Sequence, residues 1–169
     1  LNQCRIAHSH DTDSTKLLHC IQGIGKDTAK RPEHTLILGG LCGRIDQTFG
    51  TFQSILLGKS HLQTPIYVLD GDNLLFIVDQ GAHSFSMDRK LLTDVCGIVP
   101  ICQTDTRVST TGLRWDLENT SMRFGGVIST SNRLDSNEIT IKTSAPLVVS
   151  FELMPAVTNV DSSKAFKKD

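Results

Sequence analysis

The chain has 169 residues, of which 38% are hydrophobic and 21% are charged, and its formal net charge is -1. This size and composition are typical of a folded globular protein with one large or two small domains. So small a net charge gives no broad field that would attract nucleic acid or an anionic membrane, and we expect neither as a partner. No apolar run approaches the roughly 20 residues that a membrane-spanning helix needs.

The cysteines indicate a reducing compartment. There are five, at Cys4, Cys20, Cys42, Cys96 and Cys102. Their odd number and the lack of a Cys-x-x-Cys spacing argue against a structural zinc site and against a secreted disulfide framework. We therefore expect reduced thiols and a cytoplasmic location.

The first 64 residues alternate between helix, strand and glycine-rich loop. A first helix is predicted by apolar residues at helical spacing, namely Leu17, Leu18, Ile21 and Ile24. Asp13 or Ser14 can cap this helix and Gly25 can end it. Residues 34–38 are predicted to form a short buried strand, and residues 45–57 a second helix that Gly58 ends. This alternation is typical of a parallel α/β sheet, of which one strand can be only a part.

From residue 65 to residue 153 the pattern is one of short strands and turns. We expect strands over residues 66–69, 74–78, 83–87, 95–100, 107–110, 113–117, 121–124, 138–143 and 147–153. Turn-forming residues such as Asp70-Gly71-Asp72-Asn73 separate them. Many short strands at close spacing favour an antiparallel sandwich or barrel. The periodicity is lost over residues 154–169, which we expect to be a disordered tail.

Two groups in the first 64 residues are candidates for binding a magnesium–phosphate ligand. Asp11, Asp13 and Lys16 precede or open the first predicted helix, where carboxylates suit a metal and the lysine suits a phosphate; the alternative is an ordinary helix cap. The second group is Gly-Gly-Leu-Cys-Gly-Arg-Ile-Asp-Gln, residues 39–47. Its glycines let backbone N–H groups approach an anion, Arg44 suits phosphate and Asp46 suits a metal. The alternative there is a tight turn with an exposed ion pair.

A third candidate site lies in the strand-rich part of the chain. It comprises two polar runs, residues 109–115 and Ser129, Thr130, Ser131 and Asn132. Hydroxyl and amide groups near strand ends can orient a small polar ligand, although such residues more often serve ordinary turns. Trp115, the only tryptophan, is expected to anchor the core of this part.

Taken in order, three motifs identify a family resemblance. They are Leu-Gly-Gly-Leu-Cys-Gly-Arg-Ile-Asp-Gln (38–47), Thr-Thr-Gly-Leu-Arg-Trp-Asp-Leu (110–117) and Ser-Thr-Ser-Asn (129–132). Together with Asp13-Ser14-Thr15-Lys16, they resemble the eukaryotic thiamin pyrophosphokinases over about residues 8–153. The resemblance implies transfer of pyrophosphate from ATP to the hydroxyl of thiamin, with Mg²⁺, giving thiamin diphosphate and AMP.

The resemblance also implies a fold and an assembly. Residues 1–64 would be the closing part of a Rossmann-like α/β domain that binds ATP, and residues 65–153 an antiparallel β-sandwich that binds thiamin. The protein would be a homodimer with its active sites at the interface.

Site residues follow from the resemblance in the same way. The catalytic residues would be Asp13, Arg44 and Asp46, with Asp13 and Asp46 as metal ligands. The ATP phosphates would contact Lys16, Gly39, Gly40, Gly43, Arg44 and Gln47. Thiamin would contact Ser129, Thr130, Ser131 and Asn132.

The chain departs from the family pattern in ways that leave alternatives open. It carries no copy of the acidic Gly-Asp-x-Asp-Ser motif that family members have upstream, and Leu134 stands where a stacking aromatic is expected. We therefore expect a family member that lacks its N-terminal part. One alternative is a catalytically inactive form that acts only in dimerisation or ligand binding. Another is a different nucleotide-dependent kinase or a small-ligand binding module with the same architecture.

Overall fold

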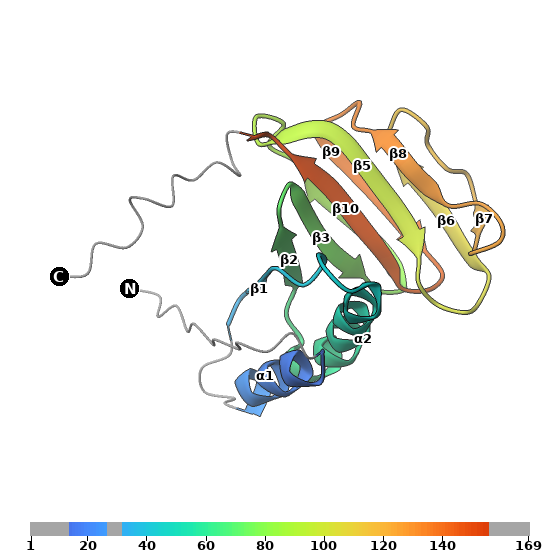
Figure 1. Ribbon diagram of the computed structural model, residues 1–169. Helices are drawn as coiled ribbons and strands as arrows, with labels where there is room; N and C mark the ends of the chain where they lie inside the picture. Colours follow the sequence, from blue (N-terminus) through green and yellow to red (C-terminus); the bar gives the residue numbers. More distant parts are fainter. Residues whose placement is uncertain (1–13, 27–31, 156–169) are drawn as a thin grey trace. The chain divides into compact units, whose positions relative to one another are not determined.

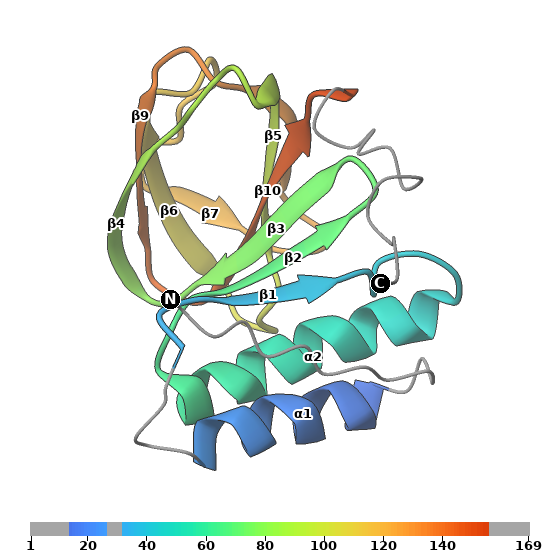
Figure 2. The same cartoon turned by 90° about the vertical axis from the view of Figure 1, so that its left-hand side faces the viewer.

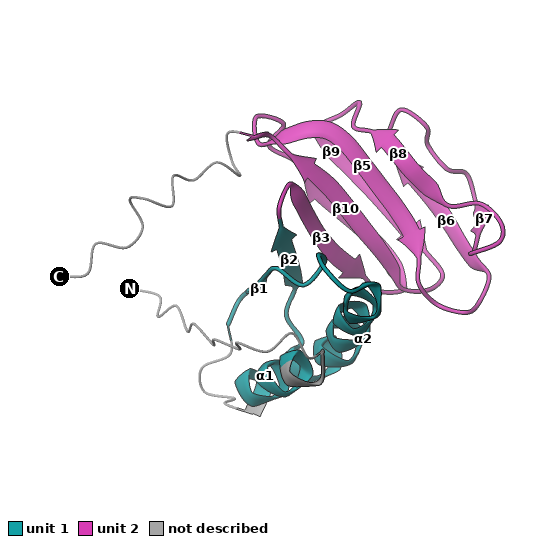
Figure 3. Ribbon diagram, viewed as in Figure 1, with its two compact units in different colours: residues 1–70 teal, residues 71–169 magenta. Residues whose placement is uncertain are grey.

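The computed structural model describes residues 14–26 and 32–155, and the chain divides into two compact units, Leu1–Asp70 and Gly71–Asp169 (Figure 3). The predicted change of pattern after residue 64 falls just before β2 (Ile66–Asp70), which belongs to the first unit. Residues 156–169 of the expected tail lie outside the described residues. None of the described helices has the length and apolar character needed to cross a membrane.

The first unit contains two helices and a pair of parallel strands (Figure 1). Helix α1 (Ser14–Lys26) is followed by β1 (Thr35–Leu38), α2 (Ile45–Leu62) and β2. β1 and β2 pair in parallel, from Thr35 opposite Ile66 to Leu38 opposite Leu69. The predicted helix, strand, loop and helix are thus present, and β2 supplies the parallel neighbour of β1.

The two helices lie side by side and approach closely at a glycine (Figure 2). Ile21 of α1 is 1% exposed, and a Cβ built on Gly58 of α2 would lie 2.6 Å from its Cγ2 atom. Gly58 therefore permits this contact. The sequence predicts that Gly58 ends the helix, and this prediction is wrong. α2 continues to Leu62 and is capped by Gln63, which has a left-handed φ of 56° and donates its N–H to the carbonyl of Lys59.

β1 differs from expectation in its burial. The sequence predicts a buried strand, but Leu36 and Leu38 are exposed while Thr35 and Ile37 are half-buried. Side chains of a strand alternate between two faces, so only one face of β1 is covered within the described residues.

The second unit consists of two antiparallel arrays of strands. In one, the order is β3 (Asn73–Val78), β10 (Leu147–Leu153), β5 (Leu92–Pro100) and β8 (Ser129–Arg133). In the other, the order is β4 (Gly81–Ser86), β9 (Glu138–Thr143), β6 (Thr106–Thr111) and β7 (Thr120–Met122).

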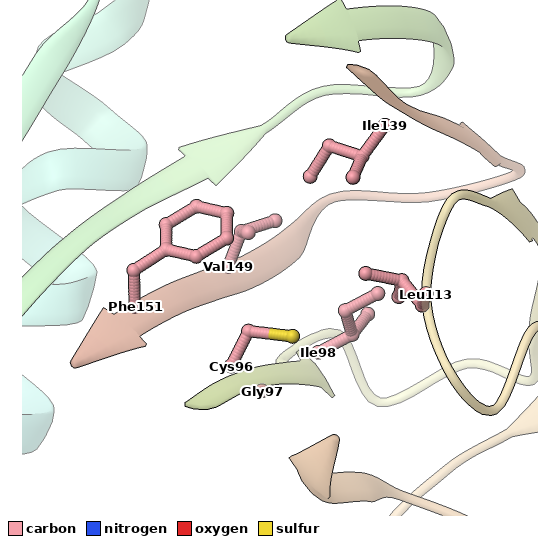
Figure 4. Close-up of a pocket in the computed structure, with 7 residues that line it drawn as sticks. All are labelled: Cys96, Gly97, Ile98, Leu113, Ile139, Val149 and Phe151. Carbon is pink, nitrogen blue, oxygen red and sulfur yellow. The ribbon is translucent and has the colours of Figure 1, made fainter. Parts of the chain in front are cut away.

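Side chains from both arrays share one apolar core. Alternation is clearest in β9, where Ile139 and Ile141 are buried between exposed neighbours. Figure 4 shows a small apolar pocket in this core, lined by Cys96, Gly97, Ile98, Leu113, Ile139, Val149 and Phe151. The thiol of Cys96 is among them, and its burial raises its pKa to about 11. Truncation of a fully buried aromatic such as Phe151 to alanine typically costs about 3–5 kcal/mol.

In this unit one predicted strand is absent and one observed strand was not predicted. Residues 113–117 form a loop with a single bridge, between Leu113 and Leu134, because Asp116 folds the chain back on itself as described below. Conversely, β8 was missed, since its sequence Ser-Thr-Ser-Asn-Arg has no alternation of apolar and polar residues.

Candidate functional site

The glycine-rich loop between β1 and α2 is the first candidate site. Gly39, Gly40 and Gly43 have φ values of 83°, 101° and 90°. These lie in the left-handed region that residues with a Cβ adopt only with strain, so the loop conformation requires glycine. Both interpretations offered by the sequence, an anion-binding loop and a tight turn with an exposed ion pair, are compatible with this geometry.

Asp70 anchors this loop, and sequence reasoning missed it. The carboxylate at the end of β2 accepts the backbone N–H of Leu41 at 2.6 Å and the thiol of Cys42 at 3.4 Å. The hydrogen bond to this carboxylate is the main reason that the pKa of the exposed Cys42 thiol is raised above its ordinary value of 9.0. A signal did exist, since Asp70 ends the strand beside β1, and ligand-binding loops in parallel sheets gather at the carboxyl ends of strands.

Two threonines of α2 hold the other side of the loop. Thr48 donates its hydroxyl to the carbonyl of Leu41 at 3.2 Å, and the buried Thr51 donates to the carbonyl of Gly40 at 2.9 Å. The loop is therefore fixed both to α2, through its carbonyl groups, and to β2, through an N–H group. A loop held in this way presents its remaining groups without a further loss of conformational entropy on binding.

Arg44 and Asp46 form an exposed bidentate ion pair where α2 begins. Arg44 Nε and Nη2 donate to the two carboxylate oxygens of Asp46 at 3.1 and 2.6 Å. The hydrogen bond from Arg44 is the main cause that holds the pKa of Asp46 below its usual range. Arg44 occupies the N-cap position and makes no side-chain cap, so the first-turn N–H groups of α2 lie beside a guanidinium, which suits an anion.

Six of the predicted residues lie in this loop or in the first turn of α2, and two predicted residues cannot be placed with them. Gly39, Gly40, Gly43, Arg44, Asp46 and Gln47 are contiguous or nearly so. Among the residues described, Gln47 Oε1 is one of three buried side-chain polar atoms without a hydrogen-bond partner. Asp13 lies outside the described residues, and Lys16 is in α1 but nothing is described of its side chain.

The second candidate site is a β-bulge in β8 of the other unit. Cys96 pairs with Asn132 and Ile98 with Ser129, so that one residue of β5 lies opposite two of β8, Thr130 and Ser131. Ser131 has a left-handed φ of 58°. Bulges re-aim side chains and are frequent beside functional sites. Both bulged residues are exposed and Ser129 is half-buried, so three of the four predicted thiamin residues are accessible.

The loop that follows β6 is closed by Asp116. The Asp116 carboxylate accepts the hydroxyl of Thr110 at 2.9 Å and the backbone N–H groups of Gly112 and Leu113 at 3.2 and 3.1 Å. Thr110 in turn accepts the N–H of Leu117 at 2.9 Å. These bonds turn the chain within six residues, which explains why the strand expected here does not form.

Asn132 connects the bulged strand to this loop. Its carboxamide accepts the N–H of Trp115 at 3.2 Å and donates to the carbonyl of Trp115 at 2.9 Å. The indole of Trp115 is 58% exposed, with the Arg114 guanidinium 5.8 Å from its ring centroid. The expectation that Trp115 anchors the core is therefore wrong, because Leu113 and Leu134 fill the core at this place.

The two sites differ in what they can bind. The glycine loop offers the start of α2 and an exposed guanidinium that is paired with Asp46, which suit phosphate groups. The bulged strand and its loop offer hydroxyl groups beside an exposed aromatic face, which suit a small polar aromatic ligand. Fold and sites together define a ligand-binding protein with one α/β unit and one antiparallel β unit.

Comparison of sequences narrows this class to a family. Residues 82–148 match the family described as thiamin pyrophosphokinase, vitamin B1 binding domain. The chain is 36% identical over 161 residues to thiamin pyrophosphokinase 1 of Caenorhabditis elegans, covering 94% of this chain and 66% of that protein. It is 34% identical over 147 residues to thiamine pyrophosphokinase 1 of Arabidopsis thaliana, covering 85% of this chain and 54% of that one.

Solved structures agree with this result. A thiamin pyrophosphokinase from Geobacillus thermodenitrificans matches with a TM-score of 0.68 and 20% identity, covering 89% of this chain and 65% of that chain. The yeast thiamin pyrophosphokinase matches with a TM-score of 0.65 and 26% identity, covering 70% and 39%. The chain belongs to the thiamin pyrophosphokinase family. It spans about half to two-thirds of the length of these curated relatives.

Proposed function

We propose that this protein is a thiamin pyrophosphokinase, which transfers pyrophosphate from ATP to the hydroxyl of thiamin. The observation that carries the proposal is the identity of 36% to the nematode thiamin pyrophosphokinase along nearly the whole of this chain. The match of residues 82–148 to a vitamin B1 binding domain supports thiamin as the acceptor. The comparisons do not favour the inactive form or a different kinase.

The fold supports the assignment of a different substrate to each part of the chain. We assign residues 1–64 to a Rossmann-like domain that binds ATP, because β1, which pairs in parallel with β2 (Ile66–Asp70), leads through a glycine loop into α2. We assign residues 65–153 to a β-sandwich that binds thiamin, because two antiparallel arrays share one core. A disordered tail over residues 154–169 stays a prediction.

On the ATP side, the loop geometry supports a proposal for the phosphate contacts. The N–H groups of Gly40 and Gly43 and the guanidinium of Arg44 would meet phosphate oxygens, with Lys16 from α1 and Gln47 from α2 beside them. The N–H of Gly39 already donates to the carbonyl of Leu69 at 2.8 Å, so Gly39 would serve the loop conformation and not a phosphate contact. The buried Oε1 of Gln47 has no partner among the described residues; as an acceptor it would bond to an N–H or O–H group of the nucleotide and not to its phosphate oxygens.

The oxygen ligands that this site offers are of the kind that Mg²⁺ prefers. Mg²⁺ in phosphate-transfer sites takes one or two carboxylates together with substrate phosphates and water. Asp46 supplies one exposed carboxylate and Asp13 would supply the other. Within residues 14–26 and 32–155 there is no group of three side chains that could hold a metal by themselves. Both oxygens of Asp46 accept from Arg44, so metal binding requires this exposed ion pair to open in part, which costs little. Bound Mg²⁺ would neutralise phosphate charge.

On the thiamin side, we assign Ser129, Thr130 and Ser131 to the polar edge of the ligand. Asn132 belongs to the same stretch, and its part is argued below. Trp115, which the sequence predicts to be a core anchor, instead adds an exposed aromatic face next to them. Aromatic ligands pack well on such a face.

The reaction asks the protein mainly to align its substrates and to neutralise charge. The thiamin oxygen bonds to the β-phosphorus of ATP while the bond from that phosphorus to the α–β bridging oxygen breaks, and AMP leaves. Arg44 would stabilise the charge on the phosphate chain, and Asp13 and Asp46 would orient the metal or the hydroxyl. A homodimer with active sites at the interface and a cytoplasmic location stay predictions.

Replacement of Arg44 tests the ATP site. Arg44→Ala should lower kcat by about a hundredfold or more, because it removes a cation at the transferring group. A matched control is Arg107→Ala, which breaks an exposed pair of the same spacing, between Arg107 and Asp105, in the other unit. Thiamin diphosphate formation is measured for both variants. Near-normal turnover in Arg44→Ala would remove Arg44 from the mechanism.

A further inference from the structure

The side chain of Asn132 is a buried junction between β8 and the loop after β6. Asn132 is 2% exposed. Its Oδ1 atom accepts the N–H groups of Trp115 at 3.2 Å and Arg133 at 2.8 Å. Its Nδ2 atom donates to the carbonyl of Trp115 at 2.9 Å and to the hydroxyl of Ser129 at 3.1 Å.

These four hydrogen bonds use every hydrogen-bond donor and acceptor of the side chain. A primary carboxamide has two lone pairs on its oxygen and two N–H donors on its nitrogen. All four are used inside the protein, so a ligand could bond to Asn132 only by displacing a partner from a buried position, which is unfavourable. A direct contact with thiamin, as the motif suggests, does not fit this geometry.

The bonds instead set the place of two groups that are accessible. Arg114 donates its N–H to the carbonyl of Arg133 at 2.8 Å, so backbone pairing joins the loop to β8 up to that residue. At the next residue of the loop, Trp115, the Asn132 carboxamide bonds to both the backbone N–H and the backbone carbonyl. The same carboxamide holds the hydroxyl of Ser129. The backbone that carries the exposed indole and the serine hydroxyl are therefore held relative to one another.

We propose that Asn132 is a positioning residue that acts through Trp115 and Ser129 and does not contact the ligand. This inference rests on the proposed thiamin site, which it deepens. Without the carboxamide, the backbone groups of Trp115 lose their partners and the indole becomes free to move. Thiamin would then have to order the loop as it binds, which weakens binding.

The single tryptophan makes the first half of the proposal directly measurable. Time-resolved fluorescence anisotropy of the full chain reports the local motion of Trp115 alone, because no other tryptophan is present. Asn132→Ala should increase the amplitude of fast indole motion in the absence of any ligand. The matched control is Asn137→Ala, an exposed asparagine of the same unit, which should leave the anisotropy unchanged.

A double-mutant cycle tests the second half. Thiamin affinity is measured by calorimetry for the full chain and for Asn132→Ala, Trp115→Ala and the double variant. Asn132→Ala should weaken binding by about tenfold when Trp115 is present. In the Trp115→Ala background the same change should cost clearly less than this, because only the route through Ser129 remains and a residue that acts through another is not additive with it.

Asn132→Asp replaces Asn132→Ala in both measurements if the alanine variant does not fold. It keeps the size of the side chain and the acceptor for the N–H groups, but it loses the donors to Trp115 and Ser129. The unfolding midpoint of each variant is recorded, and binding is compared well below it. A residue needed only for stability would lower this midpoint without changing the anisotropy of the folded chain.

The outcomes separate the inference from the function on which it rests. Equal weakening of thiamin binding in both backgrounds would show a direct contact and overturn the positioning role. Unchanged indole motion in both Asn132 variants would overturn it as well. If the unmodified chain binds no thiamin while Asn132→Ala still frees the indole, the proposed function fails and the structural link between Asn132 and Trp115 stands.

Discussion

At the residue scale, short polar side chains define both candidate sites by bonding to distant backbone groups. Asp70 bonds to Leu41, 29 residues away, and Asn132 bonds to Trp115, 17 residues away. The residue types at the sites could be predicted from the motifs, because those motifs are contiguous. The partners could not, since hydrogen bonds across such separations depend on which strands become neighbours. This is why Asp70 was missed and why Asn132 was taken for a ligand contact.

The contact between Asp70 and Cys42 predicts a pH-dependent reactivity. A thiol that donates to a carboxylate is harder to ionise, so Cys42 should be alkylated by iodoacetamide with a pH midpoint above its ordinary value of 9.0. Asp70→Asn removes the negative charge and should move this midpoint down, with faster alkylation at pH 8. Mass spectrometry of the modified peptide follows Cys42 specifically.

Cys102 provides the internal reference for this experiment, because it belongs to the other unit, Gly71–Asp169. Its alkylation rate should be the same in the unmodified chain and in Asp70→Asn. An unaltered Cys42 profile in the variant would contradict the anchoring of the loop by Asp70.

Gly112 shows how a motif glycine can serve structure instead of ligand binding. Its φ is 89°, and an added Cβ would lie 2.4 Å from the carbonyl oxygen of Glu138. Gly112→Ala should therefore lower the free energy of unfolding by about 2 kcal/mol or more, as measured by urea denaturation. Gly125→Ala is the control, since Gly125 has a φ of 79° but open space around it, and should cost only about 1 kcal/mol. Equal costs would show that the backbone contact is unimportant.

At the scale of elements, the periodic segments were predicted and the irregular ones were not. Helices α1 and α2 follow their apolar spacing, and most strands of the second unit follow their alternation. β8 could not be predicted because its bulge at Thr130 and Ser131 breaks the period of two. The end of α2 was misplaced because a glycine commonly ends a helix, whereas Gly58 serves the packing of α1 on α2.

This interpretation of Gly58 predicts opposite effects at two helical glycines. Gly58→Ala should destabilise the protein by about 1 kcal/mol, because the clash with buried Ile21 outweighs the better helix propensity of alanine. Gly23→Ala, at an exposed position of α1 with no atom near the added Cβ, should stabilise it by about 0.5–1 kcal/mol. Thermal unfolding of both variants measures the difference. Stabilisation by both changes would contradict the close helix contact.

At the scale of the whole molecule, the order of the motifs was more informative than any single element. The glycine loop with its Arg44 and Asp46, the Trp115 loop and the run from Ser129 to Asn132 occur in family order, and sequence comparison confirms the family. The fold class of parallel pairing in one unit and antiparallel pairing in the other was also predicted, because helical and strand periodicities separate near residue 65. What each unit binds remains the proposal developed above.

Product analysis with labelled ATP tests the central claim most directly. The full chain is incubated with thiamin, Mg²⁺ and ATP labelled in its β-phosphate, and the labelled products are separated. Pyrophosphoryl transfer predicts label in thiamin diphosphate, unlabelled AMP in equal amount, and no reaction without thiamin. Formation of labelled ADP, or of AMP whether or not thiamin is present, would contradict the proposed reaction, as would the absence of thiamin diphosphate from a folded chain.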